Sequence, residues 1–272
     1  MIQYLGLIDD VLKNGRRLED PKGIGNISVL GRQLRFSMKD GFPLVTTRKL
    51  KFSWFAHELI WFLSGDTRID YLNNNGVTFW DISGSKEQTS RFGREEGDLG
   101  PVYGAQWRHW KKHGGGEIDQ INNLVEEIKT KKFSKRMLVT SWNPEDIQNV
   151  SIAPCHVMFK AYVAGDTLSL HIFQRAADVY IGVPNNIACY ALLLHMLAQV
   201  TDLIPNELVY TMSDTHIYMI NIDQAKIQLA REPKQLPTLE LNKSIKDIFK
   251  FTIDDIKLSN YDPYPFIKSS VA

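Results

Sequence analysis

The sequence predicts a single α+β domain over residues 1–272, with a mixed, twisted sheet and helices packed on it. Three observations support this. Strand-like and helix-like segments interleave, but without the strict alternation that is typical of a parallel sheet. A hydrophobic fraction of 43% with 23% charged residues is ordinary for a globular protein with a large core. No low-complexity run and no proline- and serine-rich linker divides the chain.

Local patterns predict the elements. Apolar residues recur at helical spacing in residues 3–13, 52–63, 118–130, 184–200 and 218–231. Pro184 would occupy the first helical position of its segment, where proline is favoured. β-Branched or aromatic residues bounded by turn signals predict strands at 27–30, 33–36, 137–142, 157–163, 168–173 and 208–212. Glycine and charge at 82–100 and 111–116 predict loops.

Composition excludes several classes of protein. A formal net charge of +1 provides no broad basic surface for nucleic acid. The only cysteines, Cys155 and Cys189, form no disulfide framework and suit a reducing compartment. The N-terminus lacks the pattern of a signal peptide, and the apolar stretch 187–200 is shorter than the roughly 20 residues of a membrane span. We therefore expect a cytoplasmic protein that binds neither nucleic acid nor membrane.

Two residues suggest chemistry on their own. Cys155 follows Ala153 and Pro154 between two predicted strands, and a thiol favoured as thiolate by an arginine would be a nucleophile. The alternative is a small buried hydrophobic residue. Glu58 lies inside an apolar predicted helix, where a carboxylate is costly unless it is paired or functional.

Two polar groups remain open to either interpretation. Arg175 stands close to Asp178, and His216 stands between Asp214 and Tyr218. Each group would bind a polar ligand or form an ordinary salt bridge or satisfied core group. The residues alone therefore indicate an enzyme with a thiol, a buried carboxylate and an anion site, and no motif indicates a metal.

A set of longer motifs is more specific. The sequence resembles the thymidylate synthase family along nearly its whole length, and the matching segments keep their order and spacing. They are Asp40 to Thr47, His57 to Leu63, Gly97 to Gly104, Ala153 to His156, Gly182 to Pro184, Asp214 to Tyr218 and Tyr261 to Pro263.

The resemblance implies a fold, a reaction and an assembly. The fold would be thymidylate synthase-like, with one sheet face forming a homodimer interface. The reaction would transfer a one-carbon unit from the reduced folate 5,10-methylenetetrahydrofolate to C5 of a pyrimidine nucleoside monophosphate. Addition of the Cys155 thiolate to C6 would make C5 nucleophilic, and preorganised donors would stabilise the resulting enolate.

The resemblance also assigns residues to roles. The catalytic residues would be Cys155, Glu58, Tyr103, Asn186 and Asp178. Nucleotide-binding positions would be Lys22, Lys135, Arg136, Arg175, Ala176, Asn185, Asn186, His216 and Tyr218, with Lys135 and Arg136 supplied by the second subunit. Folate-binding positions would be Trp80, Asp178, Gly182 and Ala272.

The sequence departs from the family pattern around the ligands. Where the family has Asp-Arg-Thr with a phosphate-binding arginine, this sequence has Asp20, Pro21 and Lys22. Lys135 stands at the position of a second phosphate-binding arginine, Ala176 at that of a phosphate-binding serine, and Asn185 at that of a phenylalanine. Ser83 replaces a second tryptophan after Trp80, and the chain ends at Ala272, about one apolar residue short of the usual terminus. A lysine does not reproduce a bidentate arginine–phosphate contact.

These departures favour a pyrimidine nucleotide 5-hydroxymethylase that resembles the CMP hydroxymethylases of the family. A loosened sugar–phosphate pocket would admit a ribonucleotide, and a weakened seal over the folate would let water, rather than hydride, capture the methylene intermediate. Asn186 does not exclude CMP, because a flipped amide matches cytosine. The alternatives are a thymidylate synthase that converts dUMP to dTMP with release of dihydrofolate, and a non-catalytic binding protein.

Overall fold

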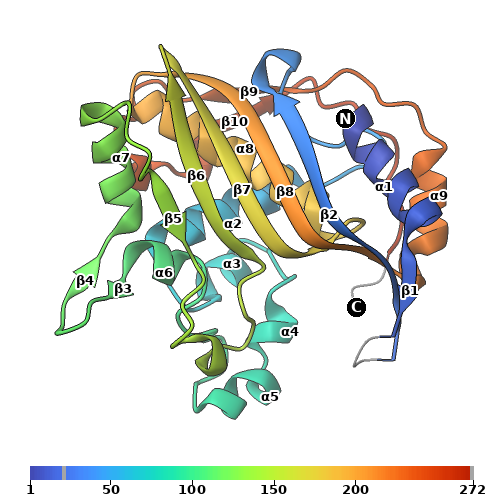
Figure 1. Cartoon of the computed structure of the whole chain (residues 1–272), viewed down its shortest axis with the longest axis horizontal. Coiled ribbons are helices and arrows are strands. Elements are labelled where there is room, and N and C mark those ends of the chain that lie inside the picture. The colour runs from blue at the N-terminus through green and yellow to red at the C-terminus, as the bar shows by residue number, and fades with distance from the viewer. Residues whose placement is uncertain (20–22, 270–272) are drawn as a thin grey trace.

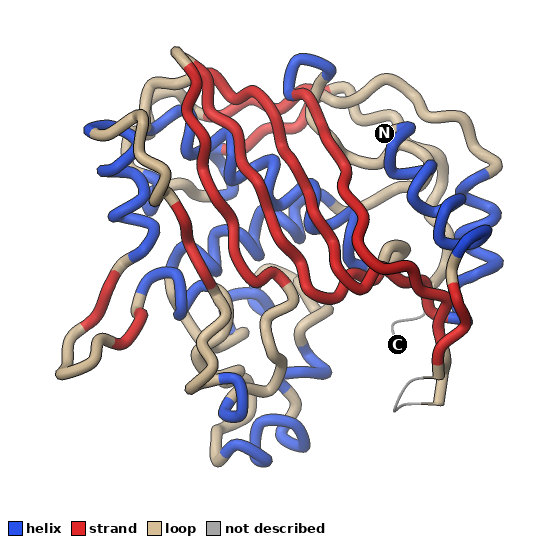
Figure 2. Tube along the Cα trace, viewed as in Figure 1, coloured by secondary structure: helices blue, strands red, loops and turns tan. Residues whose placement is uncertain are grey.

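A six-stranded sheet forms the centre of the molecule, in the order β1-β2-β8-β7-β6-β5 (Figures 1 and 2). The computed structural model describes residues 1–19 and 23–269. All neighbouring strands are antiparallel except β7 and β8, which are parallel. The sheet is therefore mixed, as the interleaved pattern predicts. The strands are β1 (Arg16–Leu18), β2 (Asn26–Ser37), β5 (Leu138–Thr140), β6 (His156–Ala164), β7 (Thr167–Asp178) and β8 (Ile204–Tyr218).

Helices cover one face of this sheet. The two central helices are α2 (Phe52–Ser64) and α8 (Gly182–Val200), and α8 packs on both β7 and β8. Figure 1 shows α1 (Ile2–Asn14) and α9 (Ile222–Leu229) beside the β2 edge, with α7 (Gln120–Thr130) beside β5. The face turned toward the viewer in Figure 1 carries strands alone.

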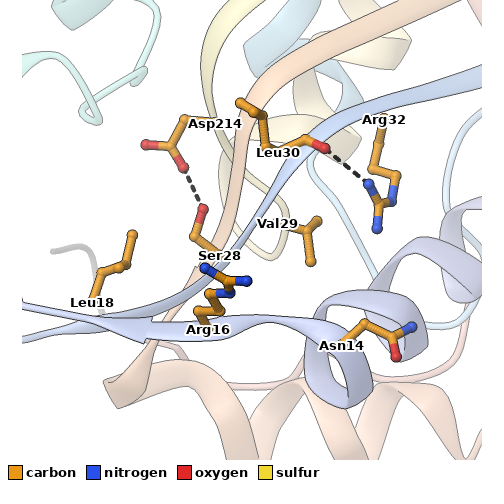
Figure 3. A pocket seen from close by; sticks show the side chains of 8 residues that line it. All are labelled: Asn14, Arg16, Leu18, Ser28, Val29, Leu30, Arg32 and Asp214. Carbon is orange, nitrogen blue, oxygen red and sulfur yellow. Dashed lines mark hydrogen bonds between the residues drawn. The ribbon is translucent and has the colours of Figure 1, made fainter.

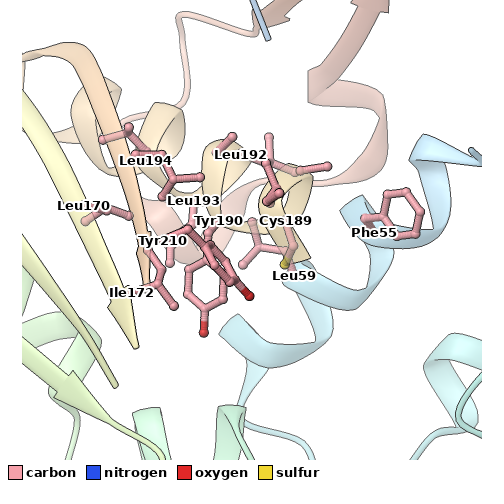
Figure 4. Packing of buried hydrophobic residues seen from close by; sticks show 14 of the residues in the cluster. Phe55, Leu59, Leu170, Ile172, Cys189, Tyr190, Leu192, Leu193, Leu194 and Tyr210 are labelled. Atoms are coloured by element: carbon pink, nitrogen blue, oxygen red, sulfur yellow. The ribbon is translucent and has the colours of Figure 1, made fainter. Parts of the chain in front are cut away.

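The core lies between the sheet and the two central helices. Figure 4 shows Tyr190 of α8 and Tyr210 of β8 among Leu170, Ile172 and other apolar side chains. Helix α8 is buried on nearly all sides because it lies between the sheet and α2, which explains why its sequence is apolar without a polar stripe. Among the described residues, no helix has both the length and the apolarity to span a membrane.

Two predicted boundaries are wrong near the site. Residues 27–30 and 33–36 belong to one strand, because the pairing of β2 with β8 keeps one register from Asn26 to Ser37. Helix α8 begins at Gly182, which puts Pro184 at its third residue instead of its first. Proline is tolerated there because the first four N–H groups of a helix have no partner within the helix.

The strands beside the site are longer than predicted. Strand β7 continues from Phe173 to Asp178, and β8 continues to Tyr218, since the two strands pair with each other up to Asp178 and His216. The helix predicted at 218–231 is accordingly shorter: a 3₁₀ turn at Met219–Asn221 precedes α9. The polar residues at the end of β7 are thus held on a strand and not on a loop.

The remaining elements are short. The predicted loop at 82–100 includes helical turns, and the one at 111–116 joins a small hairpin, whose strands pair antiparallel. A second two-stranded sheet lies near the end of the described chain. These elements are α3 (Asp70–Asn74), α4 (Asp81–Gly84), α5 (Lys86–Thr89), α6 (Gly104–Arg108), β3 (Trp110–Lys111), β4 (Glu117–Ile118), β9 (Thr238–Leu241) and β10 (Ile256–Ser259).

Candidate active site

Cys155 lies directly before β6, at the edge of the core. Its backbone nitrogen donates to the phenol oxygen of Tyr103 at 2.8 Å, and its sulfur lies 3.9 Å from a guanidinium nitrogen of Arg175. Burial raises the pKa of the Cys155 thiol, whereas the Arg175 cation and the Tyr103 hydroxyl oppose that rise. The thiol is thus half-buried next to a cation, and that cation is a feature of reactive cysteines, although burial keeps the pKa of the thiol above its ordinary value.

Arg175 holds the segment before Cys155 in place. Its Nε donates to the carbonyl of Pro154 at 3.0 Å and one Nη to the carbonyl of Ala153 at 2.9 Å. Its backbone nitrogen donates to the Cys155 carbonyl at 2.9 Å. The guanidinium carbon also lies 5.3 Å from the centre of the Trp142 ring. Strand β7 therefore fixes both the position and the electrostatic environment of the thiol.

Glu58 is both paired and unusual in its acidity. The side chain is buried in α2, and Oε1 accepts a hydrogen bond from Nε1 of Trp80 at 2.8 Å. Burial raises the pKa of Glu58 to about 7, against the opposing effect of the Trp80 hydrogen bond. A carboxyl with this pKa can accept or donate a proton near neutral pH.

Tyr103 is held in an uncommon backbone conformation. Its φ of 32° is positive, which is rare for a residue with a side chain, and such strain is found most often at functional sites. The ring stacks on Phe62 at a centroid distance of 5.0 Å and lies 5.8 Å from Trp80. A Cβ on the next residue, Gly104, would lie 2.2 Å from the Phe62 carbonyl oxygen, so only glycine permits this close approach to α2.

A row of buried polar groups adjoins the thiol. Asn186 in the first turns of α8 donates to Oε1 of Gln174 at 3.5 Å, and the Tyr210 hydroxyl donates to the same oxygen. Gln174 in turn donates to the Ala176 carbonyl at 2.8 Å. Burial lowers the pKa of His156 to about 4, so this residue next to Cys155 is neutral at physiological pH. An amide group held in this way can read the edge of a heterocyclic base.

A second polar group lies where β7 ends. Oδ1 of Asp178 accepts from the backbone nitrogens of Tyr180 and Ile181, each at 3.0 Å. Asp178 is paired with His216 across the parallel strands β7 and β8. Burial raises the pKa of Asp178, although these hydrogen bonds and the charge of His216 oppose it. Gly182 lies beside it, since a Cβ there would be 3.9 Å from Cβ of Asp178 and 3.6 Å from Nδ2 of Asn186.

Two of the residues predicted to bind the nucleotide, His216 and Tyr218, lie two positions apart at the end of β8. Nδ1 of His216 lies 3.2 Å from Oδ1 of Asp214, which also accepts from the Ser28 hydroxyl at 2.7 Å. The rings of His216 and Tyr218 meet edge to face at 5.0 Å. The surface pocket in Figure 3, about 570 Å³ in volume, includes Asp214 and Ser28 but not Cys155 or Glu58. It therefore borders this group of residues and does not contain the thiol.

Some predicted site residues lie elsewhere. Lys135 and Arg136 are exposed ahead of β5, at the opposite end of the sheet order from β1. Lys22 and Ala272 lie outside the described residues. Gln174, His156 and Tyr210 were not assigned a role from the sequence. A polar residue at an inward-facing position of β7 is the signal that would have identified Gln174.

A thiol beside a cation, a buried carboxyl with a pKa near neutrality and a strained tyrosine, all against one sheet end, are the arrangement of an enzyme that uses covalent catalysis. Residues 2–272 match the family described as thymidylate synthase. The chain therefore belongs to the thymidylate synthase family, whose members are one-carbon transferases. This confirms the predicted family, the α+β fold and the assignment as an enzyme.

Proposed function

We propose that this chain is a pyrimidine nucleotide 5-hydroxymethylase, with 5,10-methylenetetrahydrofolate as donor and CMP as the favoured substrate. One observation carries the proposal: the residues that would form the covalent adduct keep the family pattern, whereas the changes surround them. Ala176 and Lys135 alter the nucleotide's phosphate side, and Ser83 and Asn185 alter the folate side.

The mechanism begins with the thiol. Cys155 thiolate adds to C6 of the pyrimidine, aided by the Arg175 cation 3.9 Å away, and C5 becomes nucleophilic. The folate supplies the one-carbon unit that C5 attacks. The Tyr103 hydroxyl, held at the Cys155 backbone nitrogen, would help remove the C5 proton, and Glu58 would exchange protons at the ring. Loss of the C5 proton with departure of tetrahydrofolate would leave a methylene carbon on C5. Capture of this carbon by water, with release of Cys155 thiolate from C6, gives the hydroxymethyl product.

The site residues fit a reduced folate. Both described hydrogen bonds to Asp178 go to Oδ1, so Oδ2 can receive N–H groups of a pterin. Gly182 leaves space beside it, and the Trp80 indole provides an aromatic wall. These residues would orient the donor. Ser83, half-buried one turn after Trp80, offers less aromatic cover than the tryptophan expected there, which favours entry of water.

The sugar and the base would be read on opposite sides of Arg175. Ala176 pairs with Asp214 of β8, and Asp214 precedes His216 by two residues. The lack of a hydroxyl group at Ala176 would therefore change the sugar–phosphate side of the site. Asn186 would read the base, oriented by its hydrogen bond to Gln174. Because an amide can present either its oxygen or its nitrogen, Asn186 would accommodate the amino group of cytosine.

A homodimer would complete the site. The uncovered sheet face exposes Leu138, Met158 and Tyr162, which are 42%, 37% and 61% accessible. Exposed apolar side chains on a sheet face mark an interaction surface. A second subunit packed on this face would bring its Lys135 and Arg136 to the phosphate.

A second candidate function is that of thymidylate synthase itself, acting on dUMP. Cys155, Glu58 and Tyr103 serve both reactions, which differ only in whether water or hydride reaches the methylene carbon. Mass spectrometry of the products separates them, after incubation with methylenetetrahydrofolate and competing dUMP, UMP, dCMP and CMP. The proposal predicts hydroxymethyl-CMP as the main product; a methylated nucleotide from dUMP would overturn it.

A further inference from the structure

The side-chain oxygen of Asn185 is buried without a hydrogen-bond partner among the described residues. A buried carbonyl oxygen without a donor costs about 1–3 kcal/mol, so such a group is retained where a ligand or water supplies the donor. Asn185 directly precedes Asn186 in the first turns of α8, beside the polar groups that line the site. The missing donor must therefore come from whatever fills the site.

The face of α8 that carries Asn185 is turned toward α2. Residues four apart lie on one helix face, so Asn185 shares its face with Cys189. Figure 4 shows Cys189 pointing from α8 toward Leu59 of α2. Burial raises the pKa of Cys189, and the nearby Glu58 carboxylate raises it further. Asn185 thus lies on this face near the N-terminus of α8, next to Asn186, and Glu58 lies on α2, the helix that packs against it.

Glu58 and Asn185 are acceptors on α2 and α8, two helices that pack against each other. Glu58 uses Oε1 for the Trp80 indole, and its carboxyl group changes protonation near neutral pH. A water molecule between Glu58 and Asn185 would donate one hydrogen to each. Its lone pair would then be directed away from both acceptors, toward the nucleotide, as a nucleophile requires.

We propose that Asn185 is a positioning residue that holds, together with Glu58, the water that captures the methylene carbon. This inference rests on the proposed hydroxymethylase function. The water oxygen forms a bond to the methylene carbon while one proton passes to Glu58. The electron pair moves into the pyrimidine ring, C5=C6 re-forms, and the C6–sulfur bond breaks to release Cys155 thiolate. The step needs no oxidant or reductant.

The test compares Asn185→Leu, which removes the acceptor, with Asn185→Ser, which keeps an oxygen. Cys189→Ala is the matched control, because it changes a residue on the same face of α8 whose side chain is not proposed to hold the water. CMP tritiated at C5 reports formation of the methylene adduct by tritium release, and mass spectrometry reports the product in a single turnover. In Asn185→Leu, hydroxymethyl product per tritium released falls about tenfold or more, because a displaced water attacks poorly. Asn185→Ser recovers most of the ratio, and Cys189→Ala retains it.

Two results would overturn the inference. The first is an unchanged ratio in Asn185→Leu while the wild-type enzyme makes hydroxymethyl product. The second is a variant that alters only the preference between CMP and UMP, which would make Asn185 a base reader. Failure of the proposed function is seen separately, since the wild-type enzyme would then yield only methylated nucleotide.

Discussion

The phenol oxygen of Tyr103 accepts a hydrogen bond from the backbone nitrogen of Cys155 at 2.8 Å. Through this bond the strained turn at Tyr103, stacked on Phe62 of α2, is connected to the segment that carries the thiol. Cys155, which we propose as the nucleophile, is therefore connected both to the helix that carries Glu58 and to the strand that carries Arg175.

Cys155→Ser is expected to lower turnover by several orders of magnitude, because an alkoxide is far less available than a thiolate at neutral pH. Cys189→Ala, in the buried middle of α8, should change turnover little. Steady-state kinetics with the two variants checks both statements. Near-normal turnover in Cys155→Ser would reject the assignment of the nucleophile.

Arg175→Met is expected to raise the pKa of the Cys155 thiol further, because the cation that opposes the effect of burial is lost. The rate of alkylation by iodoacetamide against pH, measured in a Cys189→Ala background, reports this pKa. Arg32→Met, which removes an arginine paired with Asp10, is the control and should leave the profile in place. An identical profile for Arg175→Met would show that Arg175 does not act on the thiol.

Glu58 should make the protein less stable as pH rises. Its pKa of about 7 in the folded state lies above the ordinary value of 4.5, so the folded state binds the proton more tightly. The stability that this proton provides is complete below the ordinary pKa and is lost as pH rises through the folded one. Relative to wild type, Glu58→Gln should therefore gain on the order of 3 kcal/mol in free energy of unfolding between about pH 4 and about pH 8. Urea unfolding of both proteins at both pH values measures this gain. If the difference in free energy of unfolding between Glu58→Gln and wild type is the same at both pH values, the pKa of Glu58 is not raised.

Ala176 and Lys135 are expected to set the sugar preference. The double variant Ala176→Ser, Lys135→Arg should move the preference toward the deoxynucleotide by about tenfold or more, roughly 1.4 kcal/mol. Competition between CMP and dCMP measures this ratio. Lys132→Arg, an exposed change in the same segment, serves as control. If the double variant keeps the wild-type ratio, these two residues do not select the sugar.

The sequence pattern predicted the mixed sheet and the main helices, since apolar periodicity and turn residues are local signals. It underestimated β7 and β8, because their polar ends, with Arg175 and Asp178, lack the strand composition that identifies Phe173 and the residues before it. Those ends are strands owing to their pairing with each other, which is a long-range interaction.

The candidate site could be predicted only in part, because it too depends on contacts between residues far apart in the sequence. Motif resemblance identified Cys155, Glu58 and Tyr103 as a set, but the positive φ of Tyr103 and the Trp80 indole on Glu58 depend on the folded backbone. Single polar residues such as Gln174 were not assigned, since their burial beside Asn186 arises only when β7 and α8 pack together.

The most direct test of the account follows hydrogen from C6 of the folate. Family members that methylate transfer this hydrogen to the methylene carbon, whereas capture by water leaves it on the folate. With methylenetetrahydrofolate tritiated at C6 and each of CMP, dCMP, UMP and dUMP, we predict that tritium stays on recovered tetrahydrofolate and that no dihydrofolate forms. Tritium in a new methyl group on any of the four nucleotides would contradict the proposed hydroxymethylase function.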